Sequence, residues 1–167
     1  MGRDDQNTCP FCKKAATGQY LPVRDLILEF SCDRCGKYRV TEEALQFLGN
    51  ERLSPNLFKL SAFTRNRGEI ASDIVTIVEE PEAVSRIPGA AIDVVSAMAL
   101  FPSKISERLD RALQNIERRS NYPGERFRIN LQDDYPLFYA ENPDACWYIG
   151  QALAGCGKTL VLSFRLG

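Results

Sequence analysis

Two pairs of cysteines, each with two residues between its members, constrain the fold of this chain more than any other feature. A two-residue spacer turns the backbone tightly enough for both sulfurs of a pair to face one ion. Gly36 follows the second pair and permits the left-handed backbone that such a turn can require. Two turns of this kind would bring four thiolates around one ion. The predicted ligands are Cys9, Cys12, Cys32 and Cys35.

The segment between the two pairs contains two β-prone runs, residues 19–23 and 25–30. A hairpin of these runs would return the second pair to the first, which is the arrangement of a zinc ribbon. Four thiolates leave no coordination position for water, so we expect zinc in a structural role. About 40 residues rarely bury enough apolar surface to fold without such support. The alternatives are a pair of disulfides or an iron site of similar geometry.

The composition of the chain argues against most enzymes. It has no His among its 167 residues, which removes the Ser-His and Cys-His nucleophile pairs and His-ligated catalytic zinc. Its 21 basic and 22 acidic residues give a net charge of −1, so the chain as a whole does not attract nucleic acid or an acidic membrane. We therefore expect no catalytic activity.

The first residues are polar and contain no secretory signal, and the longest weakly polar stretch, residues 87–102, falls short of the roughly 18 apolar residues of a membrane span. The sequence predicts a soluble, cytoplasmic protein with reduced thiols and no membrane association.

We expect an α+β chain whose first domain, residues 1–50, is the zinc ribbon with one following helix. Thr41 is placed to cap that helix, over residues 42–48. The next segment, residues 51–102, is predicted to be a helical connector. Its first helix would start at Ser54 with Pro55 in the first turn, and would stop at Gly68. The sequence leaves residues 74–78 open between strand and helix, and residues 90–100 suit a buried or partner-facing helix.

The first helix of this connector carries the most basic stretch of the chain, because residues 52–67 include no acidic side chain. It could contact phosphate, RNA or a protein partner. Alternatively, Arg65 and Arg67 only complement the negative end of the helix. The candidate binding residues are Arg52, Lys59, Arg65 and Arg67, to which the ribbon could add Lys13, Lys14, Lys37 and Arg39.

The last segment, residues 103–167, shows the order of elements of a winged helix. An amphipathic helix with apolar residues from Ile105 to Ile116 precedes an alternating strand, a short helix, a longer helix capped by Asn142 and a final strand. In the longer helix Cys146 would be a buried apolar residue, and Cys156 would be another.

The second strand of the wing is missing, because the chain stops at Gly167 after one apolar strand. We therefore expect an incomplete winged-helix-like domain that belongs to a longer protein. An unpaired strand edge of this kind could also join two copies of the chain. The helix that would read DNA exposes mainly Asp144, Tyr148 and Gln151 and offers no positive charge, so protein contact is favoured over DNA binding.

Several short motifs occur in an order that resembles a known arrangement. They are CPFC at residues 9–12, CDRCGKYRVT at 32–41, KLSA at 59–62, YPG at 122–124, DYPL at 134–137 and YAEN at 139–142. The chain resembles the zinc-ribbon plus winged-helix regions at the N-terminus of uncharacterised bacterial multi-domain proteins, some of which carry a TIR-type or other effector domain. The resemblance covers most of the chain apart from residues 71–102.

This resemblance implies a sensing or regulatory region of a bacterial response protein, such as one in anti-phage defence, with the effector domain beyond Gly167. Together with the closed cysteine site, it predicts a non-catalytic, zinc-binding recognition or adaptor module. Its partner would be another protein or the attached effector. The alternative is a nucleic-acid-binding transcriptional regulator.

Overall fold

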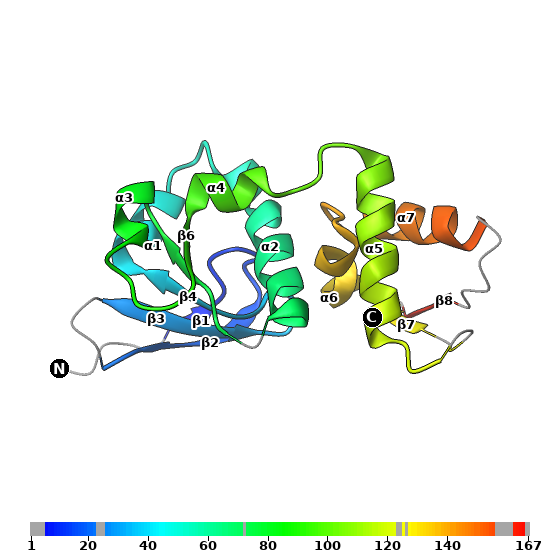
Figure 1. Ribbon diagram of the computed structural model, residues 1–167, viewed down its shortest axis with the longest axis horizontal. Coiled ribbons are helices and arrows are strands. Elements are labelled where there is room, and N and C mark those ends of the chain that lie inside the picture. The colour runs from blue at the N-terminus through cyan, green and yellow to red at the C-terminus, as the bar shows by residue number, and fades with distance from the viewer. Residues whose placement is uncertain are drawn as a thin grey trace.

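The computed structural model describes residues 6–22, 26–71, 73–122, 125, 127–155 and 162–165. The chain is α+β and forms two lobes that lie side by side (Figure 1). Each lobe has a hydrophobic core of its own. We call residues 6–102 the N-terminal lobe and residues 103–165 the C-terminal lobe.

The N-terminal lobe is built on a six-stranded sheet in which the strands lie in chain order. The strands are β1 Gln6–Thr8, β2 Ala15–Tyr20, β3 Ile27–Cys32, β4 Gly36–Thr41, β5 Thr76–Val78 and β6 Ala91–Asp93. The first four are antiparallel to one another, whereas β5 joins β4 in parallel and β6 joins β5 in parallel. The hairpin predicted between the cysteine pairs is present as β2 and β3, with bounds that differ from the predicted runs, and Cys32 lies at the end of β3 opposite the start of β4.

Helices cover this sheet and connect its parallel strands. They are α1 Glu42–Leu48, the 3₁₀ helix η1 Ser54–Asn56, α2 Leu57–Ile70, α3 Pro81–Val84 and α4 Val94–Ala99. Thr41 caps α1 as predicted, since its hydroxyl accepts a hydrogen bond of 3.2 Å from the Ala44 amide. Helix α2 lies between the sheet and the C-terminal lobe (Figure 1), and its Leu60 is fully buried in the N-terminal core with Phe30 and Tyr38.

Two predictions for this lobe are wrong in detail. Ser54 does not cap a helix with its side chain, because it begins the 3₁₀ turn that precedes α2. Helix α2 also continues past Gly68 to Ile70, and the amide of Ala71 still bonds to the Arg67 carbonyl. A glycine within a helix costs only about 1 kcal/mol relative to alanine, which packing of the other residues of α2 outweighs.

The segment predicted as a helical connector also contributes to the sheet. Residues 74–78, which the sequence left open, contain the strand β5, and residues 90–100 begin with the strand β6 before turning into α4. All three residues of β5 are buried, so the strand has no alternation that would distinguish it from a buried helix. This part of the chain completes the sheet of the N-terminal lobe.

The C-terminal lobe contains the elements that the sequence predicted, in the same order. They are α5 Ile105–Arg119, β7 Phe127–Asn130, α6 Leu131–Asp134, the 3₁₀ helix η2 Tyr135–Phe138, α7 Pro143–Gly155 and β8 Leu162–Arg165. Asn142 caps α7 as expected, accepting a bond of 2.8 Å from the Ala145 amide. Cys146 is fully buried in the core of this lobe, as predicted, whereas Cys156 lies outside the described residues.

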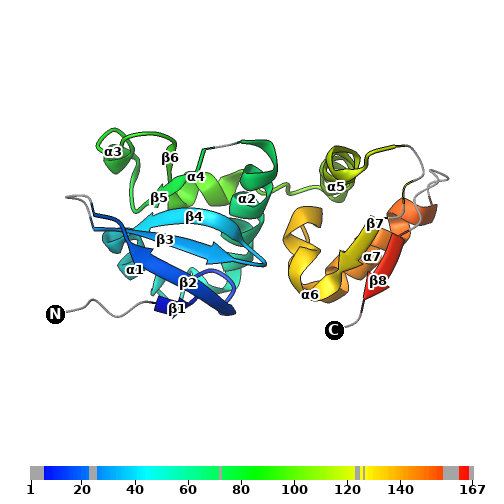
Figure 2. The ribbon, with the colours of Figure 1, turned by 90° about the horizontal axis from the view of Figure 1, so that it is seen from below.

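Strands β7 and β8 pair in parallel and lie side by side in Figure 2. Parallel strands need a crossover between them, and the winged-helix interpretation stays a prediction. Here α6, η2 and α7 lie between the two strands in the chain. The alternation of apolar and polar residues predicted both strands correctly. It contains no information on whether the two strands pair in parallel or antiparallel. In the described part of the chain, no helix is long and apolar enough to cross a membrane.

Candidate metal centre

The structure brings together the side chains of four cysteines that the sequence singled out. Cys9 and Cys12 lie in the turn between β1 and β2, and Cys32 and Cys35 lie where β3 turns into β4. Their four Sγ atoms all lie within 4.8 Å of one another. The Sγ atoms of Cys9 and Cys35 are 3.5 Å apart, and so are those of Cys12 and Cys32. This cluster could hold a metal ion, and none of its thiols is joined in a disulfide.

The two turns share a backbone feature that aims both sulfurs of a pair inward. The residue directly after the second cysteine of each pair is left-handed, with a φ of 60° at Lys13 and 77° at Gly36. In the first turn the Lys13 amide bonds to the Cys9 carbonyl at 3.0 Å, and the Cys9 amide bonds to the Lys14 carbonyl at 2.8 Å. A left-handed lysine is unfavourable and persists only where its surroundings impose it. Gly36 was recognisable from the sequence, but Lys13 was not.

The cluster is closed off from solvent on most sides. Cys9 and Cys35 are fully buried and Cys32 is nearly so, whereas Cys12 is partly exposed. The ring of Phe11 lies within the first turn and stacks on Tyr38, with 4.5 Å between ring centres. Burial of a thiolate is costly unless a cation or hydrogen bonds compensate it.

Two buried hydroxyl groups contact the cluster. Tyr38 Oη lies 2.9 Å from Cys9 Sγ, and Ser61 Oγ lies 2.9 Å from Cys35 Sγ. When these sulfurs are thiolates, the hydroxyls must donate, because a thiolate has no proton to give. Such outer hydrogen bonds hold metal ligands in position and stabilise their charge. Sequence reasoning missed both residues as site residues, since neither lies in a cysteine turn and only the fold brings β4 and α2 against the thiols.

The thiols also influence one another's ionisation. The pKa of Cys9 and that of Cys35 are raised, mainly by hydrogen bonding with the Cys12 thiol. The same thiol is the main cause that lowers the pKa of Cys32. Opposite shifts arise because four thiolates cannot be packed together without a cation to balance their charge. A cation would allow all four to ionise together.

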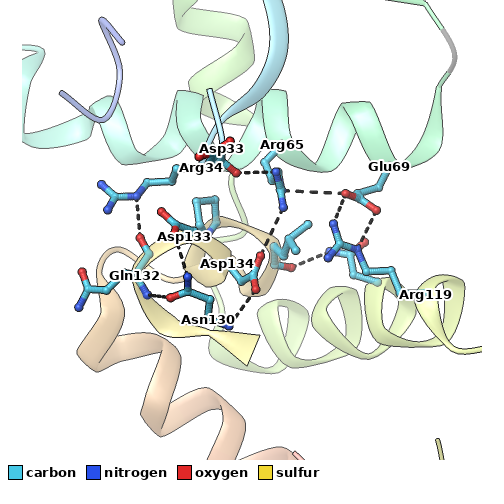
Figure 3. A network of polar contacts seen from close by, with 12 residues as sticks. Asp33, Arg34, Arg65, Glu69, Arg119, Asn130, Gln132, Asp133 and Asp134 are labelled. Carbon is cyan, nitrogen blue, oxygen red and sulfur yellow. Dashed lines mark hydrogen bonds and ion pairs between the residues drawn. The ribbon is translucent and has the colours of Figure 1, made fainter. Parts of the chain in front are cut away.

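The turns that carry the cysteines also hold the C-terminal lobe (Figure 3). Arg34, between Cys32 and Cys35, donates from Nε to the Gln132 carbonyl at 2.8 Å, and its guanidinium lies 4.9 Å from the centre of the Tyr135 ring. In the other turn, Lys14 forms an ion pair with Asp133. Both cysteine turns therefore contact the region of α6 and η2 directly.

Helix α2 makes further contacts between the lobes. Arg65 donates from Nη1 to the Asp33 carbonyl at 2.7 Å and lies 3.3 Å from the carboxylate of Asp134, so it joins a cysteine turn to α6 (Figure 3). One turn later, Glu69 forms an ion pair with Arg119 of α5. Deeper in the interface, the side-chain amide of Asn66 donates to the Pro136 carbonyl at 2.8 Å.

The four basic candidates of the connector differ in their surroundings. Arg65 is only 18% exposed and is engaged at the interface, so it is not on a free basic surface. Arg52 is exposed, whereas Lys59 and Arg67 line a pocket on the other side of α2. Of the four ribbon candidates, Lys14 pairs with Asp133, and both Lys37 and Arg39 pair with Glu29. Lys13 donates to the carbonyl of Pro10. The structure does not gather these eight residues into one basic surface.

Comparisons with protein-family models, with curated proteins and with solved structures found no match for this chain.

Proposed function

We propose that the cysteine cluster binds one zinc ion. Zinc bound by four sulfurs at about 2.3 Å in a tetrahedron places those sulfurs about 3.8 Å apart, and the observed separations lie close to this value. The four ligands are Cys9, Cys12, Cys32 and Cys35. With four thiolates the coordination is complete and no position is left for water or substrate, so the ion stabilises the fold and does not act on a substrate.

The chain is then a non-catalytic, zinc-stabilised recognition or adaptor module. The observation that supports this most strongly is that both cysteine turns contact the C-terminal lobe as well as the ion, through Lys14 and Arg34. An ion that orders these turns also fixes the surface against which the second lobe docks. Such a module would hold a partner protein or an attached effector in a defined orientation. The resemblance described above supports a place in a bacterial response system, such as defence against phage.

The alternative, a regulator that binds nucleic acid, requires basic residues free to contact phosphates. Five of the eight basic candidates are in ion pairs with carboxylates of the chain itself, which weakens this alternative. We expect single-stranded and duplex oligonucleotides to bind no tighter than the non-specific range, about 10⁻⁴ to 10⁻⁶ M near physiological salt. Fluorescence anisotropy over a series of salt concentrations measures this. Submicromolar affinity that falls steeply with salt would replace the adaptor proposal with the nucleic-acid one.

The two hydroxyls at the cluster give a test of the zinc site itself. Tyr38→Phe and Ser61→Ala each remove one hydrogen bond to a thiolate without removing a ligand, so each should weaken zinc affinity by about tenfold to a hundredfold. Competition with a chromophoric chelator measures this affinity. Tyr148→Phe is the matched control, because Tyr148 is 73% exposed on α7 and lies outside the cluster. Equal affinity in all three variants and the unmodified chain would contradict the assigned role of the hydroxyls.

A further inference from the structure

A pocket of about 190 Å³ lies where the two lobes meet. It is on the opposite side of α2 from the ion pairs that the cysteine turns make. The N-terminal lobe contributes Lys59, Phe63 and Arg67 from α2, and Phe101 from the segment after α4. The C-terminal lobe contributes Arg111 from α5 and Tyr139 from the end of η2. Lys59, Phe63 and Arg67 are spaced four apart, which places them on one face of the helix.

The charged residues of this pocket are all basic. Lys59 forms no ion pair with any described residue, and its Nζ atom lies near the ring of its neighbour Phe58. Arg67 has one exposed ion pair, with Asp73, while its Nε atom is buried without a hydrogen-bond partner among the described residues. Arg111 pairs with Glu107. Lys59 is therefore the one cation of the pocket that has no carboxylate partner among the described residues.

Aromatic rings form part of the pocket wall. The rings of Phe101 and Tyr139 meet edge to face with 6.0 Å between their centres, and the guanidinium of Arg111 lies 5.4 Å from the centre of the Tyr139 ring. Tyr139 is left-handed, with a φ of 51°, at a helix end where glycine is the usual residue. A left-handed residue other than glycine is unfavourable and persists only where its surroundings impose it.

Exposed apolar side chains flank the same place. Ile70 and Leu100 both line the pocket, and they are 61% and 49% exposed. Apolar groups held at the surface beside cationic ones are typical of ligand sites, where a few polar groups orient a mostly apolar ligand.

We propose that this pocket binds a small planar anion, namely a single aromatic or heteroaromatic ring that carries one phosphate or carboxylate group. The ring would stack against the aromatic walls, and the anionic group would contact Lys59 and Arg67. The volume is below the 300 to 1,000 Å³ that is usual for drug-sized ligands, so it suits one ring and not a larger molecule. A ligand there contacts both lobes at once and stabilises their docking. The proposal does not depend on the zinc site.

Calorimetric titration of the full chain with phenyl phosphate tests this directly. We expect saturable binding with a dissociation constant between about 10 µM and 1 mM, as for a ligand of this size. Benzyl alcohol, which keeps the ring without the charge, and inorganic phosphate, which keeps the charge without the ring, should each bind at least tenfold more weakly. Equal binding of inorganic phosphate, or no saturable binding of phenyl phosphate, would overturn the proposal.

Two variants locate the binding. Lys59→Gln should weaken phenyl phosphate binding at least tenfold, whereas Arg52→Gln, the same loss of charge at an exposed residue outside the pocket, should leave it unchanged. Equal effects of the two substitutions would contradict the assigned site. An oligouridylate that binds far more tightly than phenyl phosphate, with a steep dependence on salt, would replace the small ligand with nucleic acid.

Discussion

Replacement of Cys32 with serine should release the metal ion and unfold the N-terminal lobe. Serine is a poor ligand for zinc compared with a thiolate, and the remaining three sulfurs cannot complete a tetrahedral site. In small zinc-stabilised domains the ion contributes about 10 to 16 kcal/mol of apparent folding free energy, which exceeds the total stability of most domains. We expect the purified variant to contain less than about a tenth of an ion per chain and to lose its cooperative unfolding transition.

A second buried thiol provides the control. Cys146 is fully buried in the C-terminal core, outside the cluster. Cys146→Ser makes the same chemical change there, so it should keep the full metal content and cost only about 1 to 3 kcal/mol for burial of a hydroxyl. Metal content by elemental analysis and far-ultraviolet circular dichroism distinguish the two variants. Full metal content in Cys32→Ser would contradict the assignment of this ligand.

The second large effect is expected at the interface between the lobes. Arg65→Met keeps the length of the side chain but removes the hydrogen bond to the Asp33 carbonyl and the ion pair with Asp134. Arg65 and Asp134 are 18% and 14% exposed, so the carboxylate would be left mostly buried without its main cation. We expect the free energy of unfolding of the C-terminal lobe to fall by about 2 to 3 kcal/mol.

The single tryptophan of the chain, Trp147, lies on α7 and reports on this lobe by its fluorescence during denaturation with urea. Arg67→Met is the matched control, two residues along the same helix. Its ion pair with Asp73 is largely exposed, with fractions of 40% and 58%, so its loss should cost less than about 1 kcal/mol. The same small effect in both variants would show that the cysteine turns and α2 do not hold the C-terminal lobe.

The part of the site that the sequence predicted is the part encoded locally. Each cysteine pair lies within one turn, so spacing alone indicates that its two sulfurs face the same point. Tyr38 and Ser61 escaped prediction because their contacts with Cys9 and Cys35 span 29 and 26 residues. Nothing in the local sequence distinguishes a tyrosine that reaches a thiolate from one that fills a core.

The fold was predictable to a similar degree. Capping by Thr41 and Asn142 is a local signal that the structure confirms. The apolar face of α5 is confirmed from Leu109 to Ile116, whereas Ile105 at its start is 59% exposed. The parallel pairings escaped prediction because they depend on distant partners. Strands β5 and β6 are three residues each, too short for periodicity to identify. Strands β7 and β8 are joined by a crossover, and the alternation within each strand does not indicate that the two pair with each other in parallel.

The central claim is that one ion bound by four thiolates organises the N-terminal lobe and the surface on which the C-terminal lobe docks. Elemental analysis of the full chain, purified without added metal, together with counting of free thiols after denaturation in a chelator, tests it most directly. The account predicts about one zinc per chain, with all four clustered cysteines recovered as free thiols. Material without a tightly bound transition metal, or with these cysteines joined as disulfides, would contradict it.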